Sequence, residues 1–219
     1  METAMKITFI GNSHTYVNLL PYQVKFLLET VDKQKCEIRM VTVGGKSLGW
    51  HADQPNTQAA IKYHPADIIV LQQATHPWAG KESLMNDYNS LEPFLDENPA
   101  NVYLYMTWAR KDKPEDQPEI DESLEHLAAE KSLTKVPVSI AWQKVVSDHP
   151  DIELYSDDGS HAGEYGTYLA ACTFYSVITG NSPIGLPCKT IIHKDILADI
   201  PKENAEAMQK IIADVCGTQ

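Results

Sequence analysis

The chain has few cysteines and no recognisable metal-binding pattern. Its four cysteines, among 219 residues, show no paired spacing, and they are Cys36, Cys172, Cys188 and Cys216. This spacing argues against a disulfide framework or a zinc knuckle and favours small buried apolar side chains. The histidines form no His-Glu-x-x-His or similar motif, so we expect neither a metal nor an organic cofactor.

Positive charge and long apolar runs are also scarce. The chain holds 18 Lys and Arg against 30 Asp and Glu, a formal net charge of −12, and the basic residues form no cluster. Such a charge opposes binding to nucleic acid or to anionic lipid. No run of about 18 apolar residues occurs, and residues 1–6 leave no room for an apolar signal segment. We therefore expect no nucleic-acid or membrane partner and a cytoplasmic location, unless a signal peptide was removed from a secreted precursor.

Composition instead predicts a globular domain. Hydrophobic residues make up 43% of the chain and charged residues 22%, which is typical of a folded protein and not of a disordered one. The length suits a single domain over residues 1–219 with a full core. No internal repeat or linker interrupts it, and nothing in the pattern indicates an oligomeric state.

Short apolar runs alternate with segments of helical period. This alternation predicts an α/β protein, a three-layer α/β/α sandwich around a central parallel sheet of about five strands. The expected strands are Ile7–Ile10, Ile38–Val43, Ile68–Leu71, Val102–Met106 and Val136–Ile140. The expected helices include Leu19–Thr30, Leu124–Leu133 and Tyr165–Ile178.

One segment has an unusual composition. Lys111–Glu122 holds two prolines and many charges, which predicts a loop after the fourth strand. It is either a solvated connection or a lid, because loops after strand ends surround the site in this architecture.

Two short segments at opposite ends of the pattern carry candidate chemistry. Gly11–Thr15 follows the first apolar run, and a tight turn there would expose Ser13 at the tip of the sheet. Asp158 and His161 stand close together just before the last expected helix. Serine, aspartate and histidine in this order are the parts of a nucleophilic triad, in which His161 takes the proton of Ser13 and the acid fixes the tautomer of His161. Asp157 is adjacent and is an alternative acid.

On these residues the chain resembles the SGNH (GDSL-type) hydrolases, an esterase family whose serine, glycine, asparagine and histidine stand in separate sequence blocks. The Gly-Asp-Ser-x-Thr/Ser block resembles Gly11–Thr15, with Asn12 in the place of the aspartate. The glycine block resembles Gly44-Gly45, and the Asp-x-x-His block resembles Asp158–His161. The resemblance implies a flavodoxin-like sheet, and it selects Asp158 as the acid.

The family's third block, Gly-x-Asn-Asp, is absent. The corresponding stretch, Val70–Thr75, contains two glutamines and is closer to the version found in some carbohydrate-esterase relatives. Neighbouring strand residues face opposite sides of a sheet, so only one of Gln72 and Gln73 should point into the site. We prefer Gln73 as the side chain that replaces the family's asparagine.

A reaction at an acyl carbon also requires preset donors for the developing oxyanion. The backbone N–H of Ser13 can serve because it opens a turn into a helix. Gly45 can bring a second N–H close because it has no side chain to block approach. Gln73, or alternatively Gln72, would add an amide. If neither glutamine serves, a third donor is absent or comes from Thr75 or His76.

The tryptophans follow strand ends and are candidates for a substrate cleft; they are Trp50, Trp78, Trp108 and Trp142. They either line that cleft or simply pack loops on the sheet edge. Trp108 is the strongest of them. His14 and His51, which follow site segments, are further candidates for substrate contact.

Together these features predict a serine esterase that works through an acyl-enzyme on a small-molecule ester. The favoured substrates are small acyl esters, above all O-acetylated carbohydrates. The same triad could transfer the acyl group to an alcohol, because hydrolysis and transfer differ only in water access to the acyl-enzyme. A different class is a non-catalytic small-molecule binder on a flavodoxin-like sheet, which would lack a triad at hydrogen-bond distance.

Overall fold

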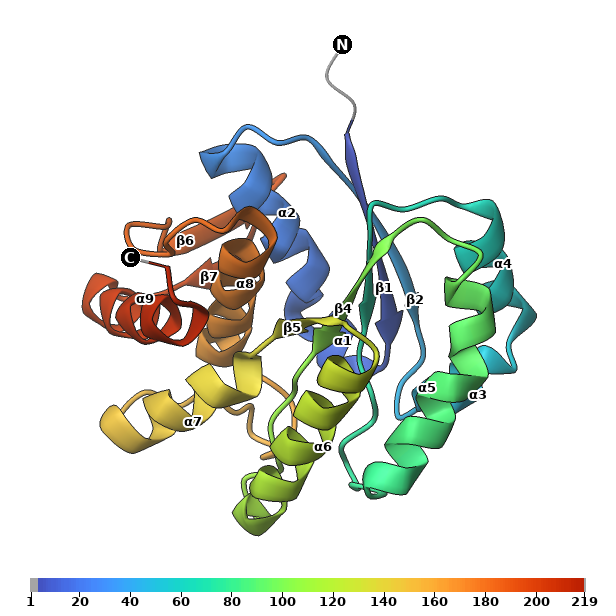
Figure 1. The fold of residues 1–219 in the computed structure, drawn as a ribbon. Coiled ribbons are helices and arrows are strands. Elements are labelled where there is room, and N and C mark those ends of the chain that lie inside the picture. Colours follow the sequence, from blue (N-terminus) through green and yellow to red (C-terminus); the bar gives the residue numbers. More distant parts are fainter. Residues whose placement is uncertain (1–3, 219) are drawn as a thin grey trace.

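Five parallel strands form the central sheet of the computed structural model, which describes residues 4–218 (Figure 1). The strands lie in the order β2-β1-β3-β4-β5. Their bounds are β1 Met5–Gly11, β2 Cys36–Thr42, β3 Ile68–Leu71, β4 Asn101–Tyr105 and β5 Thr134–Val136. The order places β1 and β3 inside the sheet, where all four residues of β3 are buried. Continuous apolar runs such as β3 are typical of strands covered on both faces.

Alternate residues of the inner strands supply two separate cores. Phe9 and Val70 belong to the core on one face, and Ile10 and Leu71 belong to the core on the other. This division follows from the two-residue period of a strand, which points successive side chains to opposite faces. The sequence therefore builds three layers, as predicted for an α/β/α sandwich.

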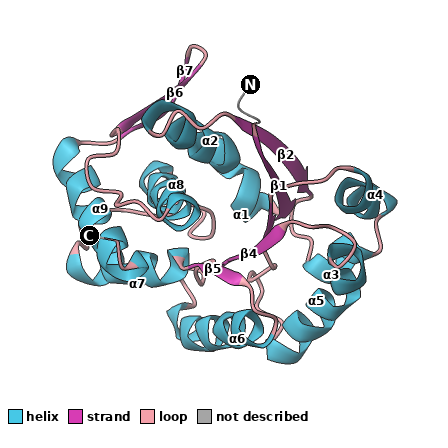
Figure 2. Cartoon of the chain, turned by 45° about the horizontal axis from the view of Figure 1, so that its top comes forward, coloured by secondary structure: helices cyan, strands magenta, loops and turns pink. Residues whose placement is uncertain are grey.

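Helices cover both faces of the sheet (Figure 2). The first face carries α2 Leu20–Val31, α7 Val138–Asp148, α8 Glu164–Thr179 and α9 Lys202–Cys216. The second face carries α3 Leu48–Ala52, α4 Pro55–Tyr63, α5 Lys81–Leu95 and α6 Gln117–Glu130. An antiparallel hairpin of β6 Lys189–Ile192 and β7 Asp195–Asp199 lies beside α2.

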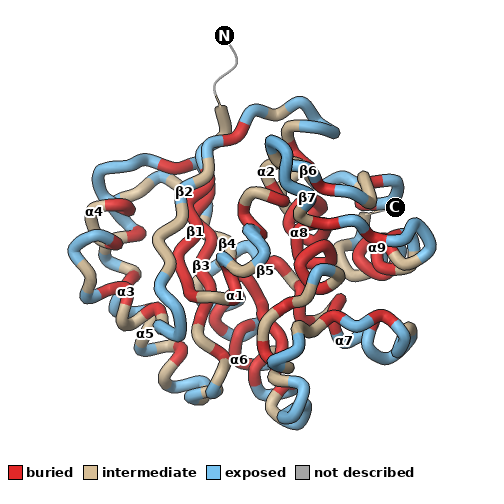
Figure 3. The backbone as a smooth tube through the Cα atoms, turned by 180° about the vertical axis from the view of Figure 1, so that it is seen from behind, coloured by how far each residue is buried: buried red, intermediate tan, exposed pale blue. Residues whose placement is uncertain are grey.

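The most enclosed helix is α8, which lies between the sheet and the outer helices of its face (Figures 2 and 3). Gly166 permits this close packing. A Cβ at that position would lie 2.3 Å from the carbonyl oxygen of Leu154 and 2.6 Å from the ring of Trp142. The segment that follows Leu154 and leads into α8 contains Asp158 and His161, so this packing fixes the second half of the candidate site.

Most of the expected elements are confirmed, with shifted ends. The predicted helices over Leu19–Thr30 and Tyr165–Ile178 appear as α2 and α8. Several elements were not among those expected, including α3, α4, α5, α7, α9 and the β6–β7 hairpin. None of the helices within residues 4–218 combines the length and the apolar character needed to cross a membrane. The four cysteines are unpaired, and Cys36 and Cys172 are buried.

Two predictions about element boundaries are wrong. The expected fifth strand over Val136–Ile140 stops at Val136, and Val138 already begins α7. The apolar run continues because the first turn of α7 is buried, and Pro137 separates the two elements by removing a ladder donor. The expected loop Lys111–Glu122 contains the start of α6, since Pro118 lies in a first turn where a missing N–H is tolerated.

Candidate active site

Ser13 is presented by the turn between β1 and the short helix α1, Ser13–Tyr16. Asn12 caps this helix, because its extended backbone lets Oδ1 accept a hydrogen bond from the N–H of His14 at 3.1 Å. Gly11 is required for the close approach behind the turn. A Cβ there would lie 2.6 Å from Gln72 Oε1 and 2.8 Å from Thr15 Oγ1.

The structure brings together the serine, histidine and aspartate that the sequence singled out. Ser13 Oγ lies 2.8 Å from His161 Nε2, and Asp158 Oδ2 lies 2.5 Å from His161 Nδ1. The first of these contacts joins residues 148 positions apart in the chain. The three side chains therefore form one hydrogen-bonded series from a hydroxyl through an imidazole to a carboxylate.

Asp158 is held ionised by its surroundings. The hydrogen bond from His161 is the largest of the causes that hold the pKa of Asp158 well below its usual range. Its Oδ1 also accepts hydrogen bonds from the N–H groups of Ser160 at 2.8 Å and His161 at 2.9 Å. A further bond comes from Ser156 Oγ at 2.8 Å. The neighbouring Asp157 takes no part in this arrangement, so Asp158 is the acid that meets the imidazole.

A cavity of about 440 Å³ lies over these groups. It is open to solvent and is bordered by the β1 turn, the loop after β2 and the loops before α5, α6 and α8. Its lining residues are Asn12, Ser13, His14, Tyr16, Val17, Gly44, Gly45, His76, Arg110, Ser160 and His161. The carboxyl ends of parallel strands meet at this edge of the sheet, which explains why segments so distant in sequence border one cavity.

Gly45 lies on a tight turn at the rim of this cavity. The N–H of Lys46 bonds to the carbonyl of Val43 at 3.2 Å, and Gly45 has φ +70°, a left-handed conformation that glycine adopts freely. Asn12 Nδ2 donates to the carbonyl of Lys46 at 3.2 Å and so ties this turn to the start of α1. The N–H groups of Ser13 and Gly45 have no protein acceptor within residues 4–218.

The expected amide donor is not found at the cavity, which corrects the preference for Gln73. Both atoms of its amide are already bonded, since Oε1 accepts from the N–H of Leu48 at 2.9 Å and Nε2 donates to Asp87 Oδ2 at 2.7 Å. Gln73 is buried and joins α3 to α5 instead of facing the cavity. Its interactions are those of a residue that holds two helices together.

The alternative, Gln72, also points away from the cavity. Its Oε1 accepts from the N–H of Asn12 at 2.8 Å and from Thr15 Oγ1 at 3.0 Å. Its Nε2 donates to the carbonyl of Gln73. Gln72 therefore supports the turn that carries Ser13 from behind, and neither glutamine borders the cavity.

His76 borders the cavity, but both of its ring nitrogens have protein partners. Nδ1 lies 2.7 Å from Ser160 Oγ, and Nε2 lies 2.9 Å from the carbonyl of Trp108. Thr75 is buried, and its hydroxyl lies 3.1 Å from that of Thr107. The described residues thus provide two unpaired backbone donors at the cavity, the N–H groups of Ser13 and Gly45, and neither glutamine joins them.

Two further imidazoles surround His161. The ring of His14 is stacked on that of His161, with centroids 5.1 Å apart, and its centroid lies 4.5 Å from that of His76. Burial is the largest cause that lowers the pKa of His14 to about 3, and burial also lowers the pKa of His76. Both rings are therefore neutral near pH 7, so these two neighbours of His161 are polar and uncharged, in contrast to the ionised Asp158.

Of the three residues expected to contact substrate, only His14 borders the cavity. Trp108 is fully buried, stacks on Trp142 at 3.8 Å between ring centroids and donates its Nε1–H to the carbonyl of Ser160 at 2.9 Å. His51 is also fully buried, with Nε2 2.8 Å from the carbonyl of Gly11. Trp108 supports the loop that carries His161 from inside the fold, and His51 supports the turn that carries Ser13. The expectation that these two residues contact substrate is wrong.

Asn18 was missed by sequence reasoning. It follows α1 with φ 52° and ψ 23°, a left-handed conformation that asparagine tolerates better than most side chains. Its Nδ2 donates to the carbonyl of Ala162 at 3.0 Å and to Thr167 Oγ1 at 2.9 Å. These bonds join the serine segment to the residue next to His161. An isolated asparagine between Val17 and Leu19 carries no sequence signal of this long-range role.

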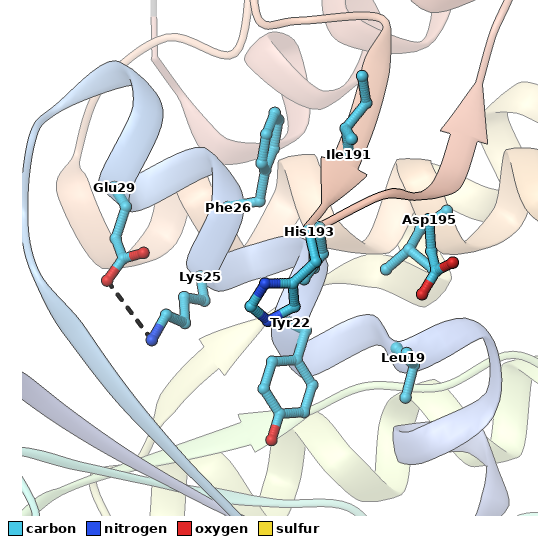
Figure 4. A pocket seen from close by; sticks show the side chains of 10 residues that line it. Leu19, Tyr22, Lys25, Phe26, Glu29, Ile191, His193 and Asp195 are labelled. Atoms are coloured by element: carbon cyan, nitrogen blue, oxygen red, sulfur yellow. Dashed lines mark ion pairs between the residues drawn. The ribbon is translucent and has the colours of Figure 1, made fainter.

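A second and larger hollow, of about 560 Å³, lies along the outer side of α2 against the β6–β7 hairpin (Figure 4). It is lined by Leu19, Tyr22, Lys25, Phe26, Glu29, Ile191, Ile192, His193, Asp195 and Leu197. Its main polar contact is the ion pair between Lys25 and Glu29, at 3.5 Å. This groove contains no serine, and no residue lines both hollows.

Comparison with known proteins agrees with the architecture. No protein-family model and no curated protein matches the sequence. The structure is similar to that of a DUF4886 family protein from Bacteroides uniformis, with a TM-score of 0.74 and 18% identity over 99% of this chain and 97% of the other.

Two solved structures of lipolytic proteins are also similar. A lipase/acylhydrolase from Enterococcus faecalis has a TM-score of 0.64 and 15% identity, over 80% of this chain and 96% of the other. A member of the lipolytic protein G-D-S-L family from Veillonella parvula has a TM-score of 0.59 and 14% identity, over 80% of this chain and 98% of the other. The chain therefore has the fold of the SGNH (GDSL-type) hydrolases, as the sequence predicted.

Within the described residues, no group of three or more histidine, cysteine, aspartate or glutamate side chains is arranged to hold a metal ion. The groups that the structure brings together at the cavity are a hydroxyl, an imidazole and a carboxylate, with two backbone donors beside them. Such a set suits acyl transfer to and from the hydroxyl.

Proposed function

We propose that the protein is a serine ester hydrolase whose nucleophile is Ser13. The observation that carries the proposal is the hydrogen-bonded series from Ser13 Oγ through His161 to Asp158, at 2.8 and 2.5 Å. The fold shared with GDSL-type lipases and acylhydrolases supports it. A non-catalytic binder would have no need of this geometry, which makes that alternative the weaker one.

The proposed reaction has two halves. Ser13 Oγ attacks the acyl carbon while His161 Nε2 takes its proton, and Asp158 stabilises the imidazolium that forms. His161 then returns the proton to the departing alcohol, which leaves Ser13 acylated. In the second half, His161 takes a proton from water as the water attacks the acyl-enzyme. His161 then returns this proton to Ser13 Oγ as the bond to the acyl group breaks and the acid is released.

The oxyanion would be stabilised by the backbone N–H groups of Ser13 and Gly45. Both residues border the cavity, and neither N–H has another protein acceptor within residues 4–218. The hydrogen bond from Asn12 Nδ2 to the carbonyl of Lys46 would hold the two N–H donors in fixed positions relative to each other. Preset donors of this kind act without reorganisation during the reaction, which is the source of their large effect.

The lining of the cavity favours a short acyl group. Apart from Val17 and Tyr16 it consists of glycines and polar side chains, and it is open to solvent. A long acyl chain would find little apolar surface to bury there. We therefore propose small acyl esters, acetyl esters first, and an O-acetylated carbohydrate as the preferred class. The second candidate, transfer of the acyl group to an alcohol, uses the same residues.

The test is a series of 4-nitrophenyl esters from acetate to octanoate. The purified protein should hydrolyse the acetate with the highest kcat/KM, and Ser13→Ala should hydrolyse none of them above background. Addition of a small alcohol would reveal transfer as a new ester product. Equal turnover by Ser13→Ala would contradict the proposal, and a preference for octanoate would contradict the short-acyl part of it.

A further inference from the structure

The lining of the candidate active site differs in charge from the chain as a whole. The protein carries a formal net charge of −12. The lining nevertheless includes no carboxylate side chain, and its one permanent charge is the guanidinium of Arg110. The imidazoles of His14 and His76 beside it are neutral near pH 7. A local positive site in an acidic protein is a feature of the cavity itself.

Arg110 is held by the same segment that carries the candidate triad. The N–H of Lys111 donates to the carbonyl of Gly159 at 2.8 Å, one residue from Asp158. On the other side, the hydroxyl of Tyr155 donates to the carbonyl of Ala109 at 2.9 Å. The backbone on both sides of Arg110 is thereby fixed relative to His161, which is the kind of support that a binding group needs.

Most of the N–H donors of the Arg110 guanidinium have no partner within residues 4–218. Its Nε donates to Asp112 Oδ1 at 2.9 Å. The two terminal nitrogens make no hydrogen bond to any of residues 4–218. Asp112 does not border the cavity and is 68% exposed, so it engages the guanidinium from the solvent side and leaves the terminal nitrogens open.

Arg110 borders the same cavity as Ser13 and His161. Its charge is one of the causes that lower the pKa of His76, whose ring borders the cavity beside Ser160. The guanidinium lies near neutral imidazoles, and its two terminal nitrogens, which no residue of 4–218 engages, are an unfilled site for an anion. Its planar edge of N–H groups matches the two oxygens of a carboxylate or a phosphate.

We propose that Arg110 selects ester substrates that carry an anionic group, a carboxylate or a phosphate, near the scissile bond. This inference rests on the proposed esterase function and adds the substrate class to it. Arg110 binds the anion and takes no part in the bond changes. Its contribution is therefore to KM and to the choice between substrates, and not to the turnover of a bound ester.

The experiment compares three acetyl esters that differ at one ring position: phenyl acetate, 4-acetoxybenzoate and 4-acetoxyphenyl phosphate. For each protein, kcat/KM of each anionic ester is divided by that of phenyl acetate. Dividing this ratio for Arg110→Gln by the ratio for the unaltered protein cancels the intrinsic reactivity of the esters. A charge-assisted pair that opens onto solvent predicts a decrease of about tenfold to a hundredfold in the ratio, through KM.

Lys113→Gln is the matched control. It removes one positive charge from the same loop at an exposed position that does not border the cavity. Its ratio should stay within about twofold of that of the unaltered protein. Arg110→Lys keeps the charge without the planar fork and should retain part of the preference. Raising the salt concentration should reduce the preference of the unaltered protein.

The two anionic esters distinguish a carboxylate from a phosphate as the group that Arg110 binds. A loss confined to 4-acetoxybenzoate assigns a carboxylate, and a loss confined to the phosphate ester assigns a phosphate. An unchanged ratio for both in Arg110→Gln, or an equal loss in Lys113→Gln, overturns the role of Arg110 while hydrolysis of phenyl acetate still supports the esterase. If the unaltered protein hydrolyses none of the three esters, the proposed function and this inference fall together.

Discussion

Each of the two hollows of the molecule is bordered by a histidine that has an aspartate a few residues away in the sequence, and the fold arranges the two pairs differently. The cavity over Ser13 holds a histidine whose acid, Asp158, is bonded to its ring at 2.5 Å. The groove along α2 also holds a histidine and an aspartate, His193 and Asp195, but no ion pair joins them within residues 4–218 (Figure 4). The groove is the larger of the two and is mostly apolar.

The difference shows that neither volume nor composition identifies the candidate site. The cavity is assembled at the carboxyl ends of the strands, where a rigid sheet fixes the turns that carry each side chain. The groove lies between a helix face and a hairpin that is outside the central sheet. If this comparison is correct, substitutions in the cavity should change ester turnover, and matched substitutions in the groove should not.

The largest effect is expected from the two histidines. His161→Ala should reduce kcat for an acetyl ester by roughly three or more powers of ten, because Ser13 loses its base. His193→Ala should leave kcat and KM unchanged. The double variant Ser13→Ala/His161→Ala should be little worse than His161→Ala, since the two residues act as one unit. Equal activity of His161→Ala and His193→Ala in steady-state kinetics would contradict the comparison.

The two adjacent aspartates provide the next contrast. Asp158→Asn should lower kcat by a factor on the order of a hundred or more, because the imidazole loses the carboxylate that sets its tautomer and stabilises its charged form. Asp157→Asn should have a mild effect, since its side chain does not bond to the ring. Kinetics of both variants test the assignment, and a reversed ranking would show that Asp157 is the acid.

Substitution of Asn18 should have an intermediate effect on kcat, because Asn18 positions the segment next to His161. Asn18→Gly keeps the left-handed backbone accessible but removes both donors to Ala162 and Thr167, so we expect kcat to fall about tenfold with KM nearly unchanged. Asn181→Ala removes a comparable surface hydrogen bond, to Asp32, and serves as the control. A purely structural role for Asn18 would instead appear as a lower melting temperature with normal kcat.

The smallest effects concern stability. The pKa of His14 is lowered in the fold to about 3 from 6.5. Between those values the unfolded chain binds one more proton, so the free energy of unfolding should fall as pH decreases, by up to about 1.4 kcal/mol per pH unit from this group. His14→Gln should flatten that dependence in denaturant titrations at pH 6.5, 5.5 and 4.5. Equal slopes for the two proteins would show that His14 is not held neutral.

Much of the fold was predictable because it depends on local pattern. The runs around Phe9 and Val70 are continuously apolar, which predicted buried strands of a parallel sheet, and Gly180 ends α8 where the helical period ends. The boundary after Val136 was not predictable, because an apolar run alone does not separate a strand from the buried first turn of α7.

The candidate triad was predictable for a different reason. Ser13, Asp158 and His161 stand in short motifs whose spacing carries the chemistry. The orientation of Gln73 depends instead on Leu48 and Asp87, which lie on other elements, and the burial of Trp108 depends on Trp142. Arg110 and Asn18 gain their proposed roles only from contacts across the fold, so no local pattern marks them.

The central claim is that Ser13 is an activated nucleophile, and a fluorophosphonate probe tests it most directly. The probe should label the protein once, and mass spectrometry of the digested adduct should place the label on Ser13. Ser13→Ala should not be labelled, whereas Ser90→Ala, which alters an exposed serine of α5, should be labelled normally. Labelling of another serine, or undiminished labelling of Ser13→Ala, would contradict the account.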